Sequence, residues 1–239
     1  ETTDGVFPAF AVEQRAHPNW PTLRRHRLAV GFYDLVDGRL QRTRRFELDV
    51  DGPRTEVPEA VGLEVPDLVL LNDDDLTYAK IRLDPVSQRT LVENIHLLDS
   101  ELARALAWGA TWDLCRDGEM KVADYVEMVL RGVGVETDLT AVTAVLGQCR
   151  LAIDYYAAPD QRTSLADRFT AGLAQLLKDS QSGSDHQLAL ARALALSIRD
   201  AEGAAVVRAW LGGAEAPAGL VVGTDLRWRL ITQLARGGE

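Results

Sequence analysis

The spacing of apolar residues changes once along the chain, and this change constrains the fold more than any other feature of the sequence. Before Pro85, apolar residues recur at every second position, whereas after it they recur three or four positions apart. A strand with one covered face has a period of two, and an amphipathic helix has a period of 3.6 residues. The sequence therefore predicts a β domain over residues 1–84 and an α-helical domain over residues 85–239.

The first domain carries the signals of short antiparallel strands. Asp37-Gly38 and Asp51-Gly52 separate alternating runs, and a glycine there supplies the positive φ of a tight hairpin turn. Residues 68–71 are short and continuously apolar, so we expect a strand covered on both faces. About seven strands, one of them over residues 76–84, are expected to form a small antiparallel β-sandwich.

The second domain carries several apolar stripes of helical spacing. The clearest recurs at i, i+3, i+4, i+7 and i+8 and consists of Val122, Tyr125, Val126, Val129 and Leu130. Side chains able to cap a first turn precede several stripes, namely Ser100, Asp138, Ser184 or Asp185, and Thr224. We expect seven or eight helices that stack into an irregular, HEAT-like superhelix.

Composition excludes several classes of partner. The net charge of −10 disfavours nucleic acid, because neutralising phosphates requires a basic face. No apolar run approaches the roughly 20 residues that a membrane-spanning helix needs, and we identify no export signal. The two cysteines, Cys115 and Cys149, do not make a disulfide framework. We therefore expect a cytoplasmic protein that binds neither nucleic acid nor a membrane.

No catalytic or metal-binding motif is found. A zinc peptidase helix places two histidines one turn apart with a glutamate base between them. The four histidines, which lack this spacing, are His17, His26, His96 and His186. Both cysteines lie in apolar stripes and are interpreted as inert core thiols. The sequence predicts no catalytic residue and no metal ligand in this chain.

Three consecutive aspartates, Asp73, Asp74 and Asp75, lie at the boundary between the two periods. The favoured interpretation is a capped turn at a domain joint. The alternative is a divalent cation site in a metal-dependent enzyme. Adjacent side chains point in different directions, and the alternating ligand spacing of a calcium loop is missing.

Some helical positions combine aromatic and charged side chains. Trp108 and Trp112 are one turn apart on the helix expected over residues 100–116, where core packing is favoured over a peptide-binding role. Arg116-Asp117 and the segment 225–228 allow two interpretations, contact with a peptide or salt-bridged helix ends, and both stay open.

Several segments, taken in order, resemble M1-family zinc metallopeptidases of the actinobacterial aminopeptidase N type. The most specific match is the stretch from Pro66 to Asp84, with its Asn-Asp-Asp-Asp-Leu-Thr-Tyr-Ala-Lys run. The other matching segments are residues 23–34, 46–52, 102–113 and 225–228.

In that family a β-saddle domain and a thermolysin-like catalytic domain precede the sandwich, and a helical superhelix closes a chamber over the active site. The resemblance implies that this chain is the sandwich with most of the superhelix, truncated at its C-terminal end, where an apolar face is expected to be bare. It implies a non-catalytic portion of a hydrolase that encloses the chamber, limits substrate size and positions the peptide. The zinc ion would belong to the absent catalytic domain.

Partners and site residues follow from the same resemblance. The implied partners are the catalytic and N-terminal domains of the same polypeptide and a peptide substrate. The substrate-chamber candidates are Tyr78, Arg116, Asp117 and Arg227. Without its catalytic domain the chain is expected to be inactive. The alternative function is that of a free-standing helical-repeat scaffold that binds a protein partner.

Overall fold

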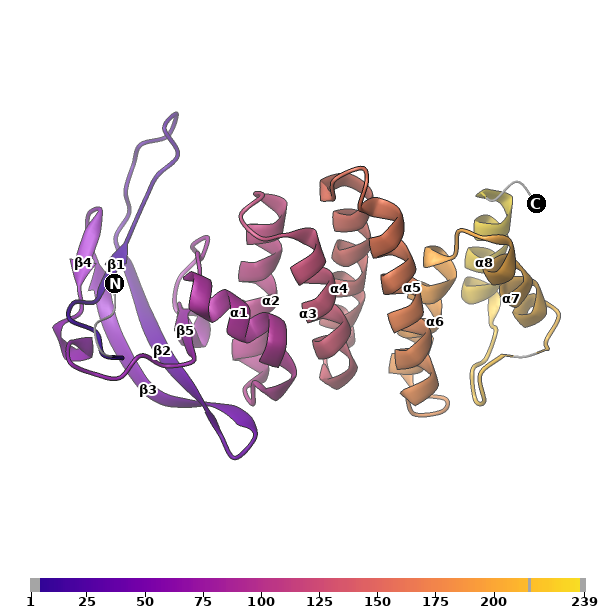
Figure 1. Cartoon of the computed structure of the whole chain (residues 1–239), viewed down its shortest axis with the longest axis horizontal. Coiled ribbons are helices and arrows are strands. Elements are labelled where there is room, and N and C mark those ends of the chain that lie inside the picture. The colour runs from indigo at the N-terminus through magenta and orange to yellow at the C-terminus, as the bar shows by residue number, and fades with distance from the viewer. Residues whose placement is uncertain (1–4, 215, 237–239) are drawn as a thin grey trace. The chain divides into compact units, whose positions relative to one another are not determined.

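The computed structural model describes residues 5–214 and 216–236, and the outermost residues of both predicted domains lie outside this part. Along the described residues, a strand region is followed by eight α-helices, which confirms the predicted β-then-α architecture (Figure 1). The chain divides into two compact units, residues 1–114 and 115–239. The domain boundary proposed at residue 84 stays a prediction.

Five strands are formed by the described residues, fewer than the seven that were predicted. They are β1 (Ala11–Glu13), β2 (His26–Val36), β3 (Arg39–Val50), β4 (Arg54–Glu56) and β5 (Leu68–Leu71). β1 pairs with β4, and a second sheet has the order β3-β2-β5, with every pair antiparallel. The strand expected over residues 76–84 is wrong, because this segment forms no ladder with any described strand.

The hairpin turn between β2 and β3 forms as predicted. Asp37 and Gly38 have φ values of 49° and 74° and connect the paired residues Val36 and Arg39. Two consecutive positive φ values are typical of the tight turns whose twist matches that of the flanking strands. This turn therefore fixes the register of the two longest strands.

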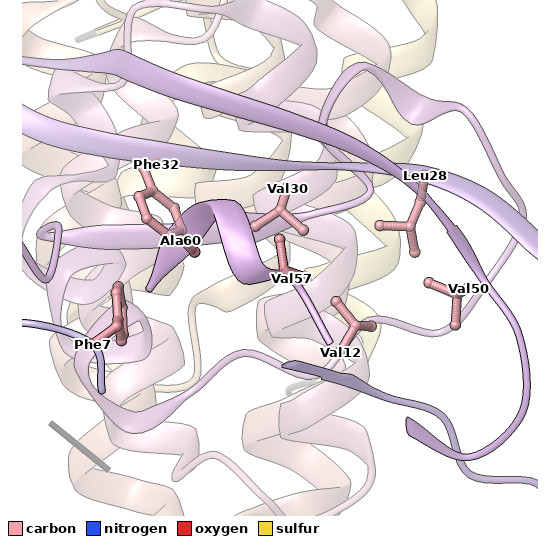
Figure 2. Close-up of a cluster of buried hydrophobic side chains, with 8 residues drawn as sticks. All are labelled: Phe7, Val12, Leu28, Val30, Phe32, Val50, Val57 and Ala60. Atoms are coloured by element: carbon pink, nitrogen blue, oxygen red, sulfur yellow. The ribbon is translucent and has the colours of Figure 1, made fainter. Parts of the chain in front are cut away.

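A buried apolar cluster fills the space between the two sheets (Figure 2). β2 contributes alternate residues that point to one face, Leu28, Val30 and Phe32, and β1 contributes Val12. The cluster is completed by Phe7, Val50, Val57 and Ala60. Because both sheets bury one face in this cluster, the predicted sandwich of two small sheets is confirmed.

The helices are α1 (Pro85–Asn94), α2 (Glu101–Arg116), α3 (Val122–Gly132), α4 (Leu139–Leu151), α5 (Arg162–Asp179), α6 (Asp185–Ser197), α7 (Ala201–Leu211) and α8 (Thr224–Arg236). In the second unit α3 packs against α5, α4 against α6, and α6 against α8 (Figure 1). Sequence neighbours α3 and α4, α5 and α6, and α7 and α8 also pack together. Contact with the next helix and with the one after it is the packing of stacked helix pairs.

Helix α1 packs on β5 in the first unit. The Val69 N–H donates to Ser87 Oγ over 2.9 Å, and Thr90 Oγ1 donates to the carbonyl of Asp67 over 2.6 Å. Leu91 of α1 is fully buried. These contacts join the first helix to the strand that precedes it in the sequence.

Capping side chains begin several helices. Asp138 accepts from the Thr140 N–H over 2.8 Å, and Ser184 rather than Asp185 accepts from the Gln187 N–H over 3.0 Å. The sequence did not lead us to predict Asp200, which accepts from the Gly203 N–H over 2.7 Å at the start of α7. Each bond satisfies one of the free N–H groups of a first turn.

Candidate functional site

The three aspartates lie in a left-handed turn, which we call the acidic turn and define as residues 72–77. Asn72, Asp74 and Asp75 have φ values of 58°, 67° and 54°. Asn72 Oδ1 accepts from the Thr77 N–H over 3.0 Å, and its Nδ2 donates to the Thr77 carbonyl over 2.8 Å. Asparagine and aspartate adopt this conformation more readily than other side chains with a Cβ atom. The side chain of Asn72 thus closes the turn at the end of β5.

Asp73 is 1 % exposed, and its carboxylate is satisfied within the first unit. Tyr33 Oη donates to Asp73 Oδ1 over 2.7 Å, and Arg42 Nη1 lies 2.8 Å from Asp73 Oδ2. Gly31 on β2 makes room for this carboxylate, because a Cβ atom at that position would overlap Asp73 Oδ2. Burial, followed by the hydrogen bond to Asp73, raises the pKa of Tyr33 above its ordinary value.

Asp74 is held by arginines of β3. Arg42 Nη1 lies 2.8 Å from Asp74 Oδ1, and Arg45 Nε lies 2.7 Å from Asp74 Oδ2. The hydrogen bond from Arg42 lowers the pKa of Asp74, and the bond from Arg45 adds to this effect. Arg45 also pairs with Glu47. Arg42 and Arg45, two members of a basic cluster on β3, are therefore bound to acidic groups.

These contacts identify the acidic turn as a structural element. The guanidinium groups and the Tyr33 hydroxyl occupy the carboxylate oxygens of Asp73 and Asp74 that a cation would need. Across residues 5–214 and 216–236, no three His, Cys, Asp or Glu side chains cluster so that they could hold a metal ion. The residues present consequently do not fit a zinc site, and the cation alternative for the acidic turn has no support.

Tyr78 follows the acidic turn directly, and its side chain is fully exposed. The residue before it, Thr77, is bound to Asn72 by two hydrogen bonds. A solvent-exposed tyrosine offers an apolar ring and a hydroxyl to a partner. The role predicted for Tyr78 in a substrate chamber stays a prediction.

The other three candidates lie at the end of α2 and on α8. Arg116 is the last residue of α2, and its Nε lies 3.8 Å from Oδ1 of the adjacent Asp117. Arg227 is an exposed residue of α8, the helix that buries Leu226 and Leu230. The side chains of all three reach solvent. Their contact with a peptide stays a prediction.

The buried aromatic and thiol groups are part of the core. Trp108 is 4 % exposed, which agrees with the favoured interpretation of core packing. Cys115 and Cys149 are both buried, and burial raises the pKa of the Cys115 thiol to about 11. A thiol with a raised pKa is a poor nucleophile, because the thiolate is the reactive form. The predicted core location of both cysteines is confirmed, and their inertness stays a prediction.

Sequence reasoning missed a hollow in the second unit where three arginines meet. They are Arg150 on α4, Arg192 on α6 and Arg229 on α8. No linear pattern joins residues on three separate helices, so only the packing of the helices reveals the group.

None of the helices formed by the described residues combines the length and apolar character needed to cross a bilayer.

Two comparisons relate the chain to known proteins. The ERAP1-like C-terminal domain family matches residues 68–239, a match that starts at the first residue of β5 and includes the acidic turn and all eight helices. The chain is also 45 % identical over 243 residues to Aminopeptidase N of Streptomyces lividans. This alignment covers 99 % of the chain but 28 % of the relative, so the chain spans little more than a quarter of that protein's length.

These matches confirm the resemblance to the C-terminal region of M1-family aminopeptidases that the segment 66–84 indicated. Since the family match extends over more than half of the sequence, the chain belongs to the ERAP1-like C-terminal domain family.

Proposed function

We propose that this chain is the non-catalytic C-terminal portion of a zinc aminopeptidase that removes N-terminal residues from peptides. The observation that carries the proposal is the 45 % identity to an aminopeptidase over 99 % of the chain. The zinc ion and the residues that act on the peptide bond would then belong to the part of the enzyme outside this chain.

The stacked helices support a role in enclosing the substrate. A stack of helix pairs presents a continuous surface, which can wall a chamber and limit the size of what enters it. Such a wall contributes to catalysis by positioning the peptide and excluding water. We assign contacts with the peptide or with the catalytic and N-terminal domains to Tyr78, Arg116, Asp117 and Arg227. A cytoplasmic location is part of the proposal.

A segment exchange tests this proposal. The region of Streptomyces lividans Aminopeptidase N that matches this chain would be replaced by the chain, and the chimera compared with a protein from which the region is deleted. We expect the chimera to hydrolyse alanine 4-nitroanilide and short peptides and to leave folded proteins intact. The protein that lacks the region should lose activity or should no longer discriminate between substrates of different size. A chimera that folds but is no better than the deletion contradicts the proposal.

The chamber candidates can be tested in the same chimera. Arg227→Ala should raise KM for peptides of several residues and leave KM for alanine 4-nitroanilide unchanged, because only the longer substrate reaches α8. Arg236→Ala is the matched control, since Arg236 is also an exposed arginine of α8. Equal effects of the two substitutions would remove Arg227 from the proposed contacts.

The isolated chain gives a second test. We expect neither hydrolysis of alanine 4-nitroanilide nor stoichiometric zinc after purification, as measured by absorbance and by atomic emission. Hydrolysis that a chelator abolishes would overturn the assignment of this portion as non-catalytic.

A further inference from the structure

The arginine hollow is a cavity of about 180 Å³ between helices of the second unit. The residues that line it include Leu146, Gly147 and Arg150 of α4, Phe169 of α5, Arg192 of α6 and Arg229 of α8. Leu146 and Phe169 are 4 % and 2 % exposed and provide an apolar wall. The hollow thus combines a hydrophobic surface with three guanidinium groups.

The positive charge of the hollow is not balanced by its own acids. Asp225 Oδ2 lies 2.7 Å from Arg192 Nη2 and 3.2 Å from Arg229 Nε, so one carboxylate serves two arginines. The bond from Arg229 contributes most to the lowered pKa of Asp225. The nearby carboxylate of Asp154 pairs with Arg199 instead. Asp225 therefore pairs with Arg192 and Arg229, and Arg150 is left without an acidic partner among the described residues.

Two of the guanidinium groups retain unused hydrogen-bonding capacity. Arg192 Nε is buried and has no hydrogen-bond partner within the described residues. The side chain of Arg150 has no ion pair or hydrogen bond with any residue that the structure describes, although Arg150 is half-buried. Arg150 lines the hollow and is partly accessible, so its guanidinium group can donate to an anionic ligand there. The imbalance is notable because the protein carries a net charge of −10.

We propose that the arginine hollow is a binding site for a small organic carboxylate with an apolar body. A carboxylate accepts two parallel hydrogen bonds from a guanidinium group, and an aliphatic body would lie against Leu146 and Phe169. The apolar wall favours this amphiphilic class over an inorganic anion, which has no apolar surface to bury. The site is independent of the proposed aminopeptidase function, since it requires only this chain.

Hexanoate is a suitable probe, and hexanamide is its uncharged counterpart of nearly the same size. Titration calorimetry on the 239-residue chain should detect hexanoate binding with a dissociation constant on the order of 1 mM and no binding of hexanamide. Arg150→Gln should weaken hexanoate binding by about tenfold or more, as expected for loss of a charge-assisted hydrogen bond. Arg44→Gln removes a charge from exposed β3 and should leave binding unchanged.

A pair of substitutions at Gly147 tests the location without altering any arginine. A Cβ atom at Gly147 meets nothing within 4 Å, so the position accepts a side chain. Gly147→Leu should fill the hollow and abolish binding, whereas Gly147→Ala should bind hexanoate as the parent does. Both replacements favour the helix, and thermal unfolding would show that each variant is folded.

Three results would overturn the proposal. They are no heat of binding up to about 20 mM hexanoate, equal binding of hexanoate and hexanamide, and unchanged binding to folded Gly147→Leu. None of these measurements involves peptide hydrolysis, so the proposed carboxylate site and the proposed aminopeptidase role stand or fall separately.

Discussion

Tyr33 joins the long strand β2 to the acidic turn through one buried hydrogen bond. Its hydroxyl donates over 2.7 Å to Asp73, a carboxylate that is 1 % exposed. Hydrogen bonds to charged groups contribute about 1.5–3 kcal/mol to stability. We expect Tyr33→Phe to lower the free energy of unfolding by this amount in urea denaturation.

Tyr155→Phe is the matched control, because the Tyr155 side chain is 72 % exposed. It should change the free energy of unfolding by less than about 0.5 kcal/mol. If the two substitutions have the same effect, the bond between Tyr33 and Asp73 does not stabilise the turn.

Asp74 gives the acidic turn a dependence on pH. Arg42 lowers the pKa of Asp74 in the folded chain, so the ion pair stabilises the fold above the ordinary aspartate pKa. This stabilisation is lost as the pH falls through the lowered pKa and the carboxylate is protonated. We expect Asp74→Asn to cost about 1 kcal/mol or less at pH 7, since the group is partly exposed.

The difference between Asp74→Asn and the parent should shrink below about pH 4, where the parent carboxylate also becomes neutral. Urea denaturation at several pH values measures it. A difference of the same size from pH 7 to pH 2.5 would show that charge is not the basis of the effect.

At the scale of elements, two adjacent polar residues at the start of α6 have different roles. Ser184 Oγ accepts from the Gln187 N–H over 3.0 Å, whereas Asp185 is the first residue of the helix. Loss of an N-cap side chain costs about 0.5–2 kcal/mol. Ser184→Ala should therefore reduce stability by about 1 kcal/mol.

Asp185→Ala removes only a favourable charge near the positive end of the helix dipole, worth a few tenths of a kcal/mol. Thermal unfolding of the two variants compares them directly. A larger loss of stability for Asp185→Ala than for Ser184→Ala would show that Ser184 is not the capping residue.

The elements also show how far a sequence can predict this fold. Residues 68–71 and the Asp37-Gly38 turn were predicted correctly, because continuous apolar runs and glycine turns are local signals. Residues 76–84 also carry a local strand signal, alternating apolar and polar residues, but they form no strand. A strand needs a neighbour with free backbone groups, and the sequence of one segment does not say whether a neighbour exists.

The candidate sites also differ in whether their signals are local in the sequence. The acidic turn was located by its composition, but the partners Tyr33 and Arg42 lie 40 and 31 residues away and come from the pairing of strands. The arginine hollow has no local signal, since its charged residues come from three helices. A site formed by neighbouring residues could therefore be predicted from the sequence. A site formed by residues far apart in the sequence could be found only from the packing of the elements.

At the scale of the molecule, the change from strand to helix need not be the boundary of a folding unit. Helix α1 follows residue 84, yet Ser87 and Thr90 bond to the segment that contains β5. Leu91 is also fully buried. We expect a fragment of residues 1–84 to unfold with less cooperativity than a fragment of residues 1–116, because the shorter one exposes the surface covered by α1.

Urea titrations followed by circular dichroism and by tryptophan fluorescence would compare the two fragments. Coincident, sharp transitions for residues 1–84 alone would support the boundary predicted at residue 84. Broad transitions in this fragment and sharp ones in the longer fragment would place α1 with the strands.

The turn between β2 and β3 also makes the chain accessible to engineering. Asp37 and Gly38 are exposed, and a Cβ atom at Gly38 would meet nothing within 4 Å. Exposed turns with few contacts tolerate inserted sequence far better than packed elements. A short epitope or a fluorophore-binding peptide could enter the polypeptide here, which would provide a reporter for following the protein in cells while both chain ends stay unaltered.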